Sequence, residues 1–418
     1  MSRGASREVE GGMRAPRALL TGSAAMFAAN LSRAVSQFLL IVVLAQLGRL
    51  EDVAYYTLAV AVTTPLFTVA EMSLRNVYLT LQHRASTNTY YGIRAVAAIT
   101  ALAASMVLFL FDPRLAAIGA LVAAVRAIDS VSDMALAPLQ QSKRYAIIAA
   151  LTGANAWITL LVAAALLFAT RSLPVALAAS LVVSAVVCVL SYLAARTRGL
   201  GPSGRSNSAR SVRGILRAGL PSGLAFASVS VLAYLPVYLL SAHGSLADIA
   251  RFAVLSYLIS FASLALGSIQ QVLIGDLADV SRSAGFGSAS RAVRRLGGPV
   301  FAITLATSLL TVWLGPVGVA LVFGPQYAVS VMEILPIAAT LLLLPIVASN
   351  SALLLVLNVY RTQLLIALAS VVAAAGMGLL LSFEGFTLVE AGLVVFAGTA
   401  VRVGLGTWVL TIRSRRTS

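Results

Sequence analysis

Polar side chains stand at helical spacing inside long apolar stretches of this sequence. Two stretches carry three such residues at positions i, i+3 and i+7: Asn30, Arg33 and Gln37 in one, Arg126, Asp129 and Asp133 in the other. At about 100° per residue, each set lies on one side of a helix. Ionisable groups in the middle of a bilayer normally face a wet cavity or a partner. We therefore expect two polar stripes that face inward.

An arginine without a neighbouring acid can bind an anion. Arg33 has no acid within one turn of its own helix, whereas Asp129 or Asp133 can neutralise Arg126. In a low-dielectric cleft, such a guanidinium attracts phosphate or carboxylate strongly. Arg402, near the middle of the last apolar stretch, is a third candidate. The alternative is that these groups only clamp helices together.

Glu71 and Arg75 are one turn apart and are predicted to pair within the membrane, mainly as a packing contact. The predicted cavity set is Arg33, Arg126, Asp129, Asp133, Arg402, Asn30 and Gln37. We expect no catalytic residue, cofactor or metal site. With only two histidines, one cysteine and one lysine, H-E-x-x-H, a disulfide framework and a P-loop are excluded.

Composition assigns the chain to the membrane proteins. Hydrophobic residues make up 60% of the 418 residues and charged residues only 11%, whereas soluble domains are about 25% charged. The net charge of +16 would suggest nucleic acid in a soluble protein. Here arginines lie at the ends of apolar segments, so they indicate topology and no nucleic-acid partner.

Runs of about 20 apolar residues predict an all-α polytopic protein with about twelve transmembrane helices. We expect a tail (1–17), an N-lobe of six helices (18–196), a basic linker (197–213), a C-lobe of six helices (214–412) and a second tail (413–418). The predicted spans are 18–47, 53–81, 91–111, 114–140, 145–169, 173–195, 214–242, 247–275, 297–323, 327–357, 362–382 and 387–411.

The distribution of basic residues predicts orientation. With both termini in the cytoplasm, 23 basic residues fall on the cytoplasmic side and 4 on the other, with three inside spans. The two longest loops, 194–213 and 276–296, would both be cytoplasmic. No external loop is long enough to hold a catalytic domain.

The two halves resemble each other at their first external turn. Gly48, Leu50, Asp52, Val53, Ala54 and Tyr56 are matched, at a constant offset of 196, by Gly244, Leu246, Asp248, Ile249, Ala250 and Phe252. In each turn the glycine is expected to end one helix and the aspartate to cap the next. Since six spans is an even number, both halves cross the membrane in the same sense, and their pseudo-two-fold axis runs along the membrane normal.

Several motifs resemble those of lipid-linked polysaccharide flippases of the O-antigen and capsule type, in the multidrug/oligosaccharidyl-lipid/polysaccharide exporter (MOP) superfamily. They are the first external turn leading through Tyr56 to Pro65, Gly219-Leu-Pro221 at the seventh helix, and Phe323-Gly-Pro-Gln-Tyr327 followed by Pro336. The resemblance covers about residues 19–412, although Asp52-Val-Ala-Tyr-Tyr56 is a loose match. Arg33 matches a position where family members often carry arginine.

The resemblance implies a non-enzymatic flippase for a polyprenyl-diphosphate-linked oligosaccharide, working by alternating access around a partly cationic central cavity in cell-surface polysaccharide synthesis. It implies a bacterial inner membrane, with membrane lipid and enzymes of the same pathway, a glycan polymerase or glycosyltransferases, as partners. One alternative is a multidrug cation antiporter of the same superfamily, which Asp129 and Asp133 would suit. Another is a membrane-embedded polysaccharide polymerase or ligase, which the absence of D-x-D and of a long external loop disfavours.

Overall fold

The computed structural model describes residues 5–80, 86–110, 112–197, 209–284, 286–357 and 359–417, and within these ranges it is all-helical. Twelve of its segments are long and apolar enough to cross a membrane, as the sequence predicts. Membrane-spanning segments are helical because backbone N–H and C=O groups in lipid find no water to bind, and a helix pairs them within itself. The chain is therefore a multi-pass membrane protein.

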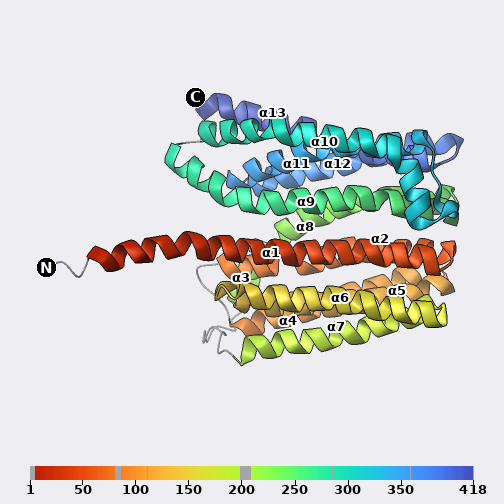
Figure 1. Cartoon of the computed structure of the whole chain (residues 1–418), viewed down its shortest axis with the longest axis horizontal. Helices are drawn as coiled ribbons and strands as arrows, with labels where there is room; N and C mark the ends of the chain where they lie inside the picture. The colour runs from red at the N-terminus through yellow and green to blue at the C-terminus, as the bar shows by residue number, and fades with distance from the viewer. Residues whose placement is uncertain are drawn as a thin grey trace.

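The helices form two lobes, one above the other in Figure 1, and both termini lie at the same end of the bundle, here called the terminal end. The N-lobe consists of α1 (Ala5–Leu47), α2 (Leu50–Glu71), α3 (Leu74–Thr80), α4 (Thr87–Phe109), α5 (Pro113–Gln141), α6 (Tyr145–Thr170) and α7 (Leu173–Arg196). The C-lobe consists of α8 (Ala209–His243), α9 (Leu246–Ala284), α10 (Phe286–Phe323), the short 3₁₀ turn η1 (Pro325–Tyr327), α11 (Val331–Val356), α12 (Tyr360–Leu381), a second 3₁₀ turn η2 (Ser382–Glu384) and α13 (Leu388–Thr417).

Several predicted boundaries differ from the structure. Helix α1 begins at Ala5 and α13 continues to Thr417, so neither predicted tail is a separate segment over these residues. The predicted loop 276–296 is mostly helical, because α9 runs to Ala284 and α10 starts at Phe286. Of the predicted linker 197–213, residues 198–208 lie outside the described residues.

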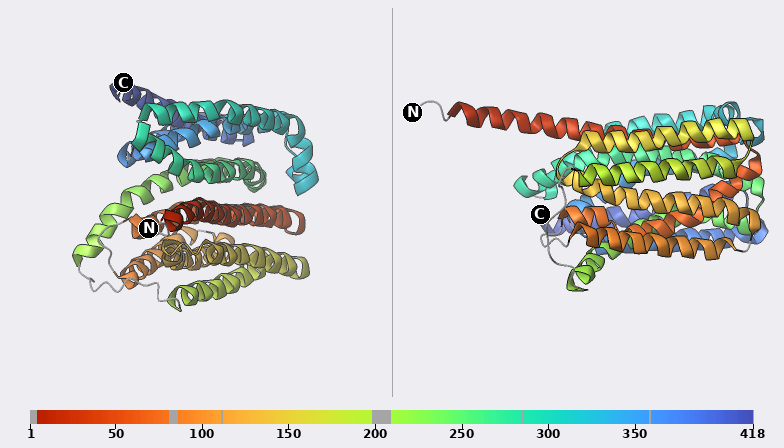
Figure 2. Two further views of the ribbon diagram at one scale, coloured as in Figure 1. Left: turned by 60° about the vertical axis from the view of Figure 1, so that its left-hand side comes forward. Right: turned by 90° about the horizontal axis from the view of Figure 1, so that it is seen from below.

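The two lobes use the same helix packing. In the N-lobe α1 packs on α6, α2 on α5, and α7 on both α5 and α6; in the C-lobe the corresponding pairs are α8 on α12, α9 on α11, and α13 on both α11 and α12. Between the lobes, α2 packs on α8 and its counterpart α9 packs on α1. Figure 2 shows the two layers from other sides. This correspondence supports two related six-span halves.

The repeated turns have the same local structure. Gly48 donates its backbone N–H to Leu44 at 2.9 Å, and Gly244 donates to Leu240 at 2.8 Å. The Asp52 carboxylate accepts from the Arg49 backbone N–H at 3.0 Å, and Asp248 accepts from Ser245 at 3.3 Å. Each aspartate thus binds the backbone at a helix N-terminus, where such a bond satisfies a donor that the helix leaves free. The predicted repeat is confirmed at this level.

At the end of the bundle opposite the termini, the C-lobe turn around η1 contacts the last residues of α1. The Gln46 side chain donates to the Val322 carbonyl at 2.7 Å, and Gln326 donates to the Ala45 carbonyl at 3.4 Å. Nearby, the rings of Phe38 and Phe323 pack edge to face with centroids 5.9 Å apart. The Phe323–Tyr327 motif therefore joins the lobes here.

The sequence predicted one continuous helix for the second span. In the structure this span breaks between α2 and α3, nearer the terminal end. Met72 and Ser73 both have left-handed backbones, with φ of 45° and 47°, a conformation that costs a non-glycine residue about 1–2 kcal/mol. The break packs against Gly219 and Gly223 of α8, where a Cβ atom would lie 2.5 Å from the Met72 carbonyl oxygen and 2.9 Å from its Cα. The absence of side chains at these two glycines lets the backbones approach this closely.

Candidate functional site

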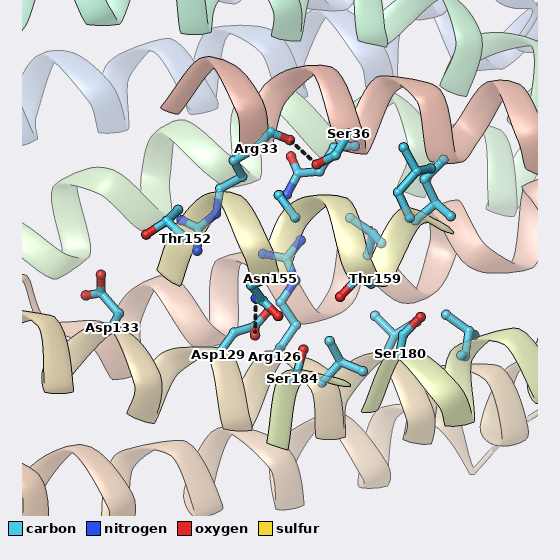
Figure 3. A pocket seen from close by; sticks show the side chains of 18 of the residues that line it. Arg33, Ser36, Arg126, Asp129, Asp133, Thr152, Asn155, Thr159, Ser180 and Ser184 are labelled. Carbon is cyan, nitrogen blue, oxygen red and sulfur yellow. Dashed lines mark hydrogen bonds between the residues drawn. The ribbon is translucent and has the colours of Figure 1, made fainter. Parts of the chain in front are cut away.

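A cavity of about 280 Å³ lies inside the N-lobe, between α1, α2, α5, α6 and α7 (Figure 3). Its lining is rich in charged, amide and hydroxyl groups. The polar residues that line it are Arg33, Ser36, Gln37, Tyr56, Glu71, Arg126, Asp129, Asp133, Thr152, Asn155, Thr159, Ser180 and Ser184. Polar groups in a membrane helix normally face such a wet space rather than lipid.

The α1 stripe reaches this cavity. Arg33 and Gln37 both line it, while Asn30 on the same stripe is not among the lining residues. The Arg33 side chain extends from α1 toward α6 (Figure 3). Within the described part of the chain, its guanidinium makes no ion pair and no side-chain hydrogen bond. Arg33 is thus a cation facing the cavity whose donors are free.

The α5 stripe faces α1 across the cavity. Arg126 donates to the Thr64 hydroxyl on α2 at 3.0 Å, and Asp129 accepts from the Asn155 amide on α6 at 3.3 Å. In Figure 3 the Arg126, Asp129 and Asn155 side chains lie next to one another. Neither Arg126 nor Asp129 belongs to an ion pair among the described residues.

Asp133 sits apart from this group and holds two arginines. It accepts from Arg75 at 2.8 Å and from Arg94 at 3.2 Å. Arg75 also donates to Gln140 at 2.7 Å. The sequence assigned Arg75 to Glu71, but the break after Glu71 separates the two helices, and the structure pairs Arg75 with Asp133 instead. The Asp133 cluster is a structural clamp at the cavity wall.

Glu71 is the last residue of α2 and lines the cavity immediately before the break at Met72. No hydrogen bond or ion pair holds its carboxylate within the described ranges. The charges that act on it are those of Arg94, Asp133, Arg126 and Arg33. The cavity therefore contains a second group, of opposite charge to Arg33, that has no direct partner.

Arg402 does not join this site. It lies in the C-lobe, where it lines a separate cavity of about 40 Å³ with residues of α8, α11 and α12. The larger of these two cavities is lined by N-lobe residues and not by Arg402, so the predicted grouping of Arg402 with Arg33 and Arg126 stays a prediction.

The site's charges nearly balance. Arg33, Arg75, Arg94 and Arg126 face Glu71, Asp129 and Asp133, which leaves one positive charge in excess at neutral pH. Since Asp133 already binds two guanidinium groups, the free charges inside the cavity are two arginines and two carboxylates. Such a site can bind an anion through the arginines, or a cation through Glu71 and Asp129. No group of three or more residues suited to hold a metal gathers within the described ranges.

The role of Arg94 and the polar lining on α6 were not predicted from the sequence. Arg94 is one of the 23 basic residues that the charge count placed on the cytoplasmic side, yet it is 1% exposed inside α4. The predicted span 91–111 already contained Arg94, and this was the available signal, because a charge inside a span needs a partner. Thr152, Asn155 and Thr159 line the cavity at spacing i, i+3, i+7, the same spacing as the two stripes.

No protein-family model and no curated protein matches the chain. Similar solved structures include an outward-facing multidrug resistance MATE family transporter of the MOP superfamily (16% identity, 96% of this chain and 97% of that chain, TM-score 0.66). Another is a MOP superfamily transporter from Pyrococcus furiosus, described as having a binding pocket of reversed polarity (15% identity, 95% of each chain, TM-score 0.66). A third is the lipid II flippase MurJ in an inward closed conformation (10% identity, 94% of this chain and 87% of that chain, TM-score 0.74). The chain therefore has the two-lobe, all-helical fold of MOP superfamily transporters.

Proposed function

We propose that this protein is a flippase that moves a polyprenyl-diphosphate-linked oligosaccharide from the cytoplasmic to the external leaflet of a bacterial inner membrane, for cell-surface polysaccharide synthesis. The N-lobe cavity binds the diphosphate. The observation that carries the proposal is Arg33, a guanidinium free of any ion pair that points into a polar cavity. Arg126 supports it from the opposite wall, held only by a neutral hydroxyl.

The size of the cavity fits the diphosphate alone, and not the whole lipid-linked oligosaccharide. Sites for whole small molecules are usually about 300–1,000 Å³, and this cavity is about 280 Å³. It suits the charged link of a lipid-linked glycan, while the glycan and the lipid extend beyond it. Arginine forks bind phosphate oxygens in pairs, which fixes the head group in one orientation.

The contacts between the lobes support alternating access. One set joins α1 to the η1 turn at the end opposite the termini, and another joins the α2 break to α8 nearer the terminal end. A substrate can cross only if these two sets open in turn. In the proposed orientation, the terminal end faces the cytoplasm.

A transport assay tests the proposal. The full-length protein is placed in liposomes with a short-chain polyprenyl-diphosphate disaccharide, and the glycan that reaches the far leaflet is measured with a glycosidase that cannot cross the membrane. Arg33→Gln should lower the rate about tenfold or more, because hydrogen bonds to charged groups contribute about 1.5–3 kcal/mol. Arg33→Lys should retain part of the rate.

The matched control is Arg114→Gln. Arg114 is 70% exposed at its side chain and pairs with the exposed Glu51, away from the cavity, so it should transport like the unmodified protein. An unchanged rate for Arg33→Gln would refute the site assignment.

One observation favours a second candidate function, export of lipophilic cations in exchange for an ion. Glu71 and Asp129 are carboxylates in the same cavity without an arginine partner. Under this alternative, liposomes with an imposed sodium or proton gradient would take up a tetraphenylphosphonium probe, and Glu71→Gln with Asp129→Asn would stop the uptake. If the protein transports the diphosphate lipid across the liposome membrane and not the cation, the flippase proposal is supported and this alternative is excluded.

A further inference from the structure

The geometry points to a second anion site, in the C-lobe, where Arg402 binds a phosphate group. Arg402 lies near the middle of the span Leu388–Arg413, far from either end of the helix. Its only hydrogen bond in the described chain is a long one, 3.4 Å to the Ser351 hydroxyl on α11. A guanidinium has five N–H donors, so most of its capacity is unused.

The C-lobe acids whose side chains the structure describes bind other groups and not Arg402. These acids are Asp248, Glu333 and Glu390. Each binds backbone groups at the first turn of its own helix: Asp248 at α9, Glu333 at α11 and Glu390, through Thr387, at α13. Among these residues none pairs with Arg402. A positive charge at this depth calls for an anion from outside the chain.

The cavity beside Arg402 has the donors for an oxyanion. Gln363 of α12 and Ser222 of α8 line it with Arg402, among otherwise apolar side chains. The Gln363 amide makes no side-chain hydrogen bond with the described residues. A volume of about 40 Å³ exceeds what one water molecule needs, so oxygen atoms of an oxyanion can enter it and reach the guanidinium. The guanidinium fork matches such a group in shape as well as in charge.

This site is independent of the N-lobe cavity in its residues, although the two are linked through the contact between the lobes. The Ser222 hydroxyl lies 3.0 Å from that of Ser73, which follows Glu71 by two residues. The C-lobe site therefore lies beside a contact that joins the lobes. The inference does not rest on the proposed substrate.

Equilibrium dialysis with radiolabelled inorganic phosphate tests it, with the full chain in a neutral, phosphate-free detergent. The starting variant is Arg33→Gln/Arg126→Gln, which removes the two free arginines of the N-lobe cavity. We expect it to retain saturable phosphate binding. Adding Arg402→Gln should reduce the bound phosphate at least tenfold, and adding Gln363→Ala should weaken binding severalfold. Monodisperse elution on size exclusion identifies the variants that fold. If the Arg402→Gln variant does not fold, the effect of Gln363→Ala on phosphate binding tests the site.

Two lipid environments distinguish the sources of the phosphate group. In nanodiscs of phosphatidylglycerol, a lipid head group at the site would compete with inorganic phosphate, whereas in digalactosyldiacylglycerol, a bilayer lipid without a phosphate group, the free anion would bind as in detergent. Loss of binding in phosphatidylglycerol but not in the phosphate-free lipid assigns the site to a lipid phosphate, and equal binding in both assigns it to the free anion. No saturable binding to the double variant, or binding that neither added substitution changes, would overturn the inference. Neither result bears on transport through Arg33.

Discussion

The hydroxyl groups of Ser73 and Ser222 lie 3.0 Å apart and join the two lobes beside the break in the second span. Ser73 is in the left-handed backbone that follows α2, and Ser222 lies between the two glycines of α8 that receive it. Glu71, two residues before Ser73, lines the N-lobe cavity, and Ser222 lines the smaller cavity around Arg402. A change at this contact therefore reaches both cavities.

A disulfide should lock this contact. In a Cys188→Ala background, which removes the only native cysteine, Ser73→Cys/Ser222→Cys places two sulfurs where hydroxyls already touch, within the reach of a disulfide. Oxidation should cross-link the pair and stop transport, and a reductant should restore it. Each single cysteine variant is the control and should be insensitive to oxidation. Undiminished transport by fully cross-linked protein would show that this contact does not open.

Glycine substitutions on α8 should loosen the same contact. Gly219→Ala adds a Cβ 2.5 Å from the Met72 carbonyl oxygen, so the lobes must separate locally. Gly214→Ala on the same helix is the matched control, because a Cβ there meets nothing within 4 Å. Both changes raise helix propensity by about 1 kcal/mol, so their difference reports the contact. In the cysteine pair, Gly219→Ala should lower the cross-linking rate severalfold and Gly214→Ala should not; equal rates would contradict the packing.

Tyr238 should stabilise the lobe interface through a carbonyl that proline leaves free. Pro65 has no N–H, so the Ala61 carbonyl lacks its helical donor, and the Tyr238 hydroxyl of α8 donates to it instead. Tyr238→Phe should lower the unfolding free energy by about 1–3 kcal/mol, the cost of an unsatisfied buried acceptor. In a Pro65→Ala background the helix can supply its own donor, so the same change should cost much less. Equal losses in both backgrounds, measured by thermal unfolding in detergent, would count against this account.

Asp133 should be needed for stability more than Asp129. Asp133→Asn removes the carboxylate from Arg75 and from the fully buried Arg94, and breaking a buried pair in this way costs about 3–5 kcal/mol. Asp129→Asn removes only a 3.3 Å hydrogen bond from Asn155, so its effect should be several times smaller. Melting temperatures of the two variants decide this; a reversed order would show that the Asp133 cluster does not hold the helices.

The spans, the repeat and the inward stripes could be predicted because each depends on local pattern. Apolar length defines a span, the Gly-x-x-x-Asp turn recurs at a constant offset, and helical spacing places Arg33 with Gln37. The break at Met72 and Ser73 could not be predicted from the sequence, because neither residue is a glycine or proline. Its conformation depends on glycines of α8 that lie about 150 positions away. For the same reason the sequence paired Arg75 with its neighbour Glu71, whereas tertiary packing brings Asp133 closer.

The location of Arg402 shows that a charged residue in a span does not identify the cavity it faces. A stripe or a lone charge indicates that a helix faces something polar, but it does not tell which of two lobes encloses the space. Helical spacing placed Arg33 and Arg126 correctly toward a cavity, and it gave no means of separating Arg402 from them. Arg402 lines a cavity formed by α8, α11, α12 and α13 of the C-lobe, far along the sequence from the N-lobe stripes.

Direct binding of the charged lipid tests the central claim, that the N-lobe cavity holds an anion through Arg33. The affinity of the purified protein for a short-chain polyprenyl diphosphate disaccharide is compared between the unmodified chain, Arg33→Gln and the control Arg114→Gln. The account predicts that Arg33→Gln weakens binding about tenfold to a hundredfold, as loss of about 1.5–3 kcal/mol requires, while Arg114→Gln leaves it unchanged. Equal affinities for Arg33→Gln and the unmodified chain would contradict it.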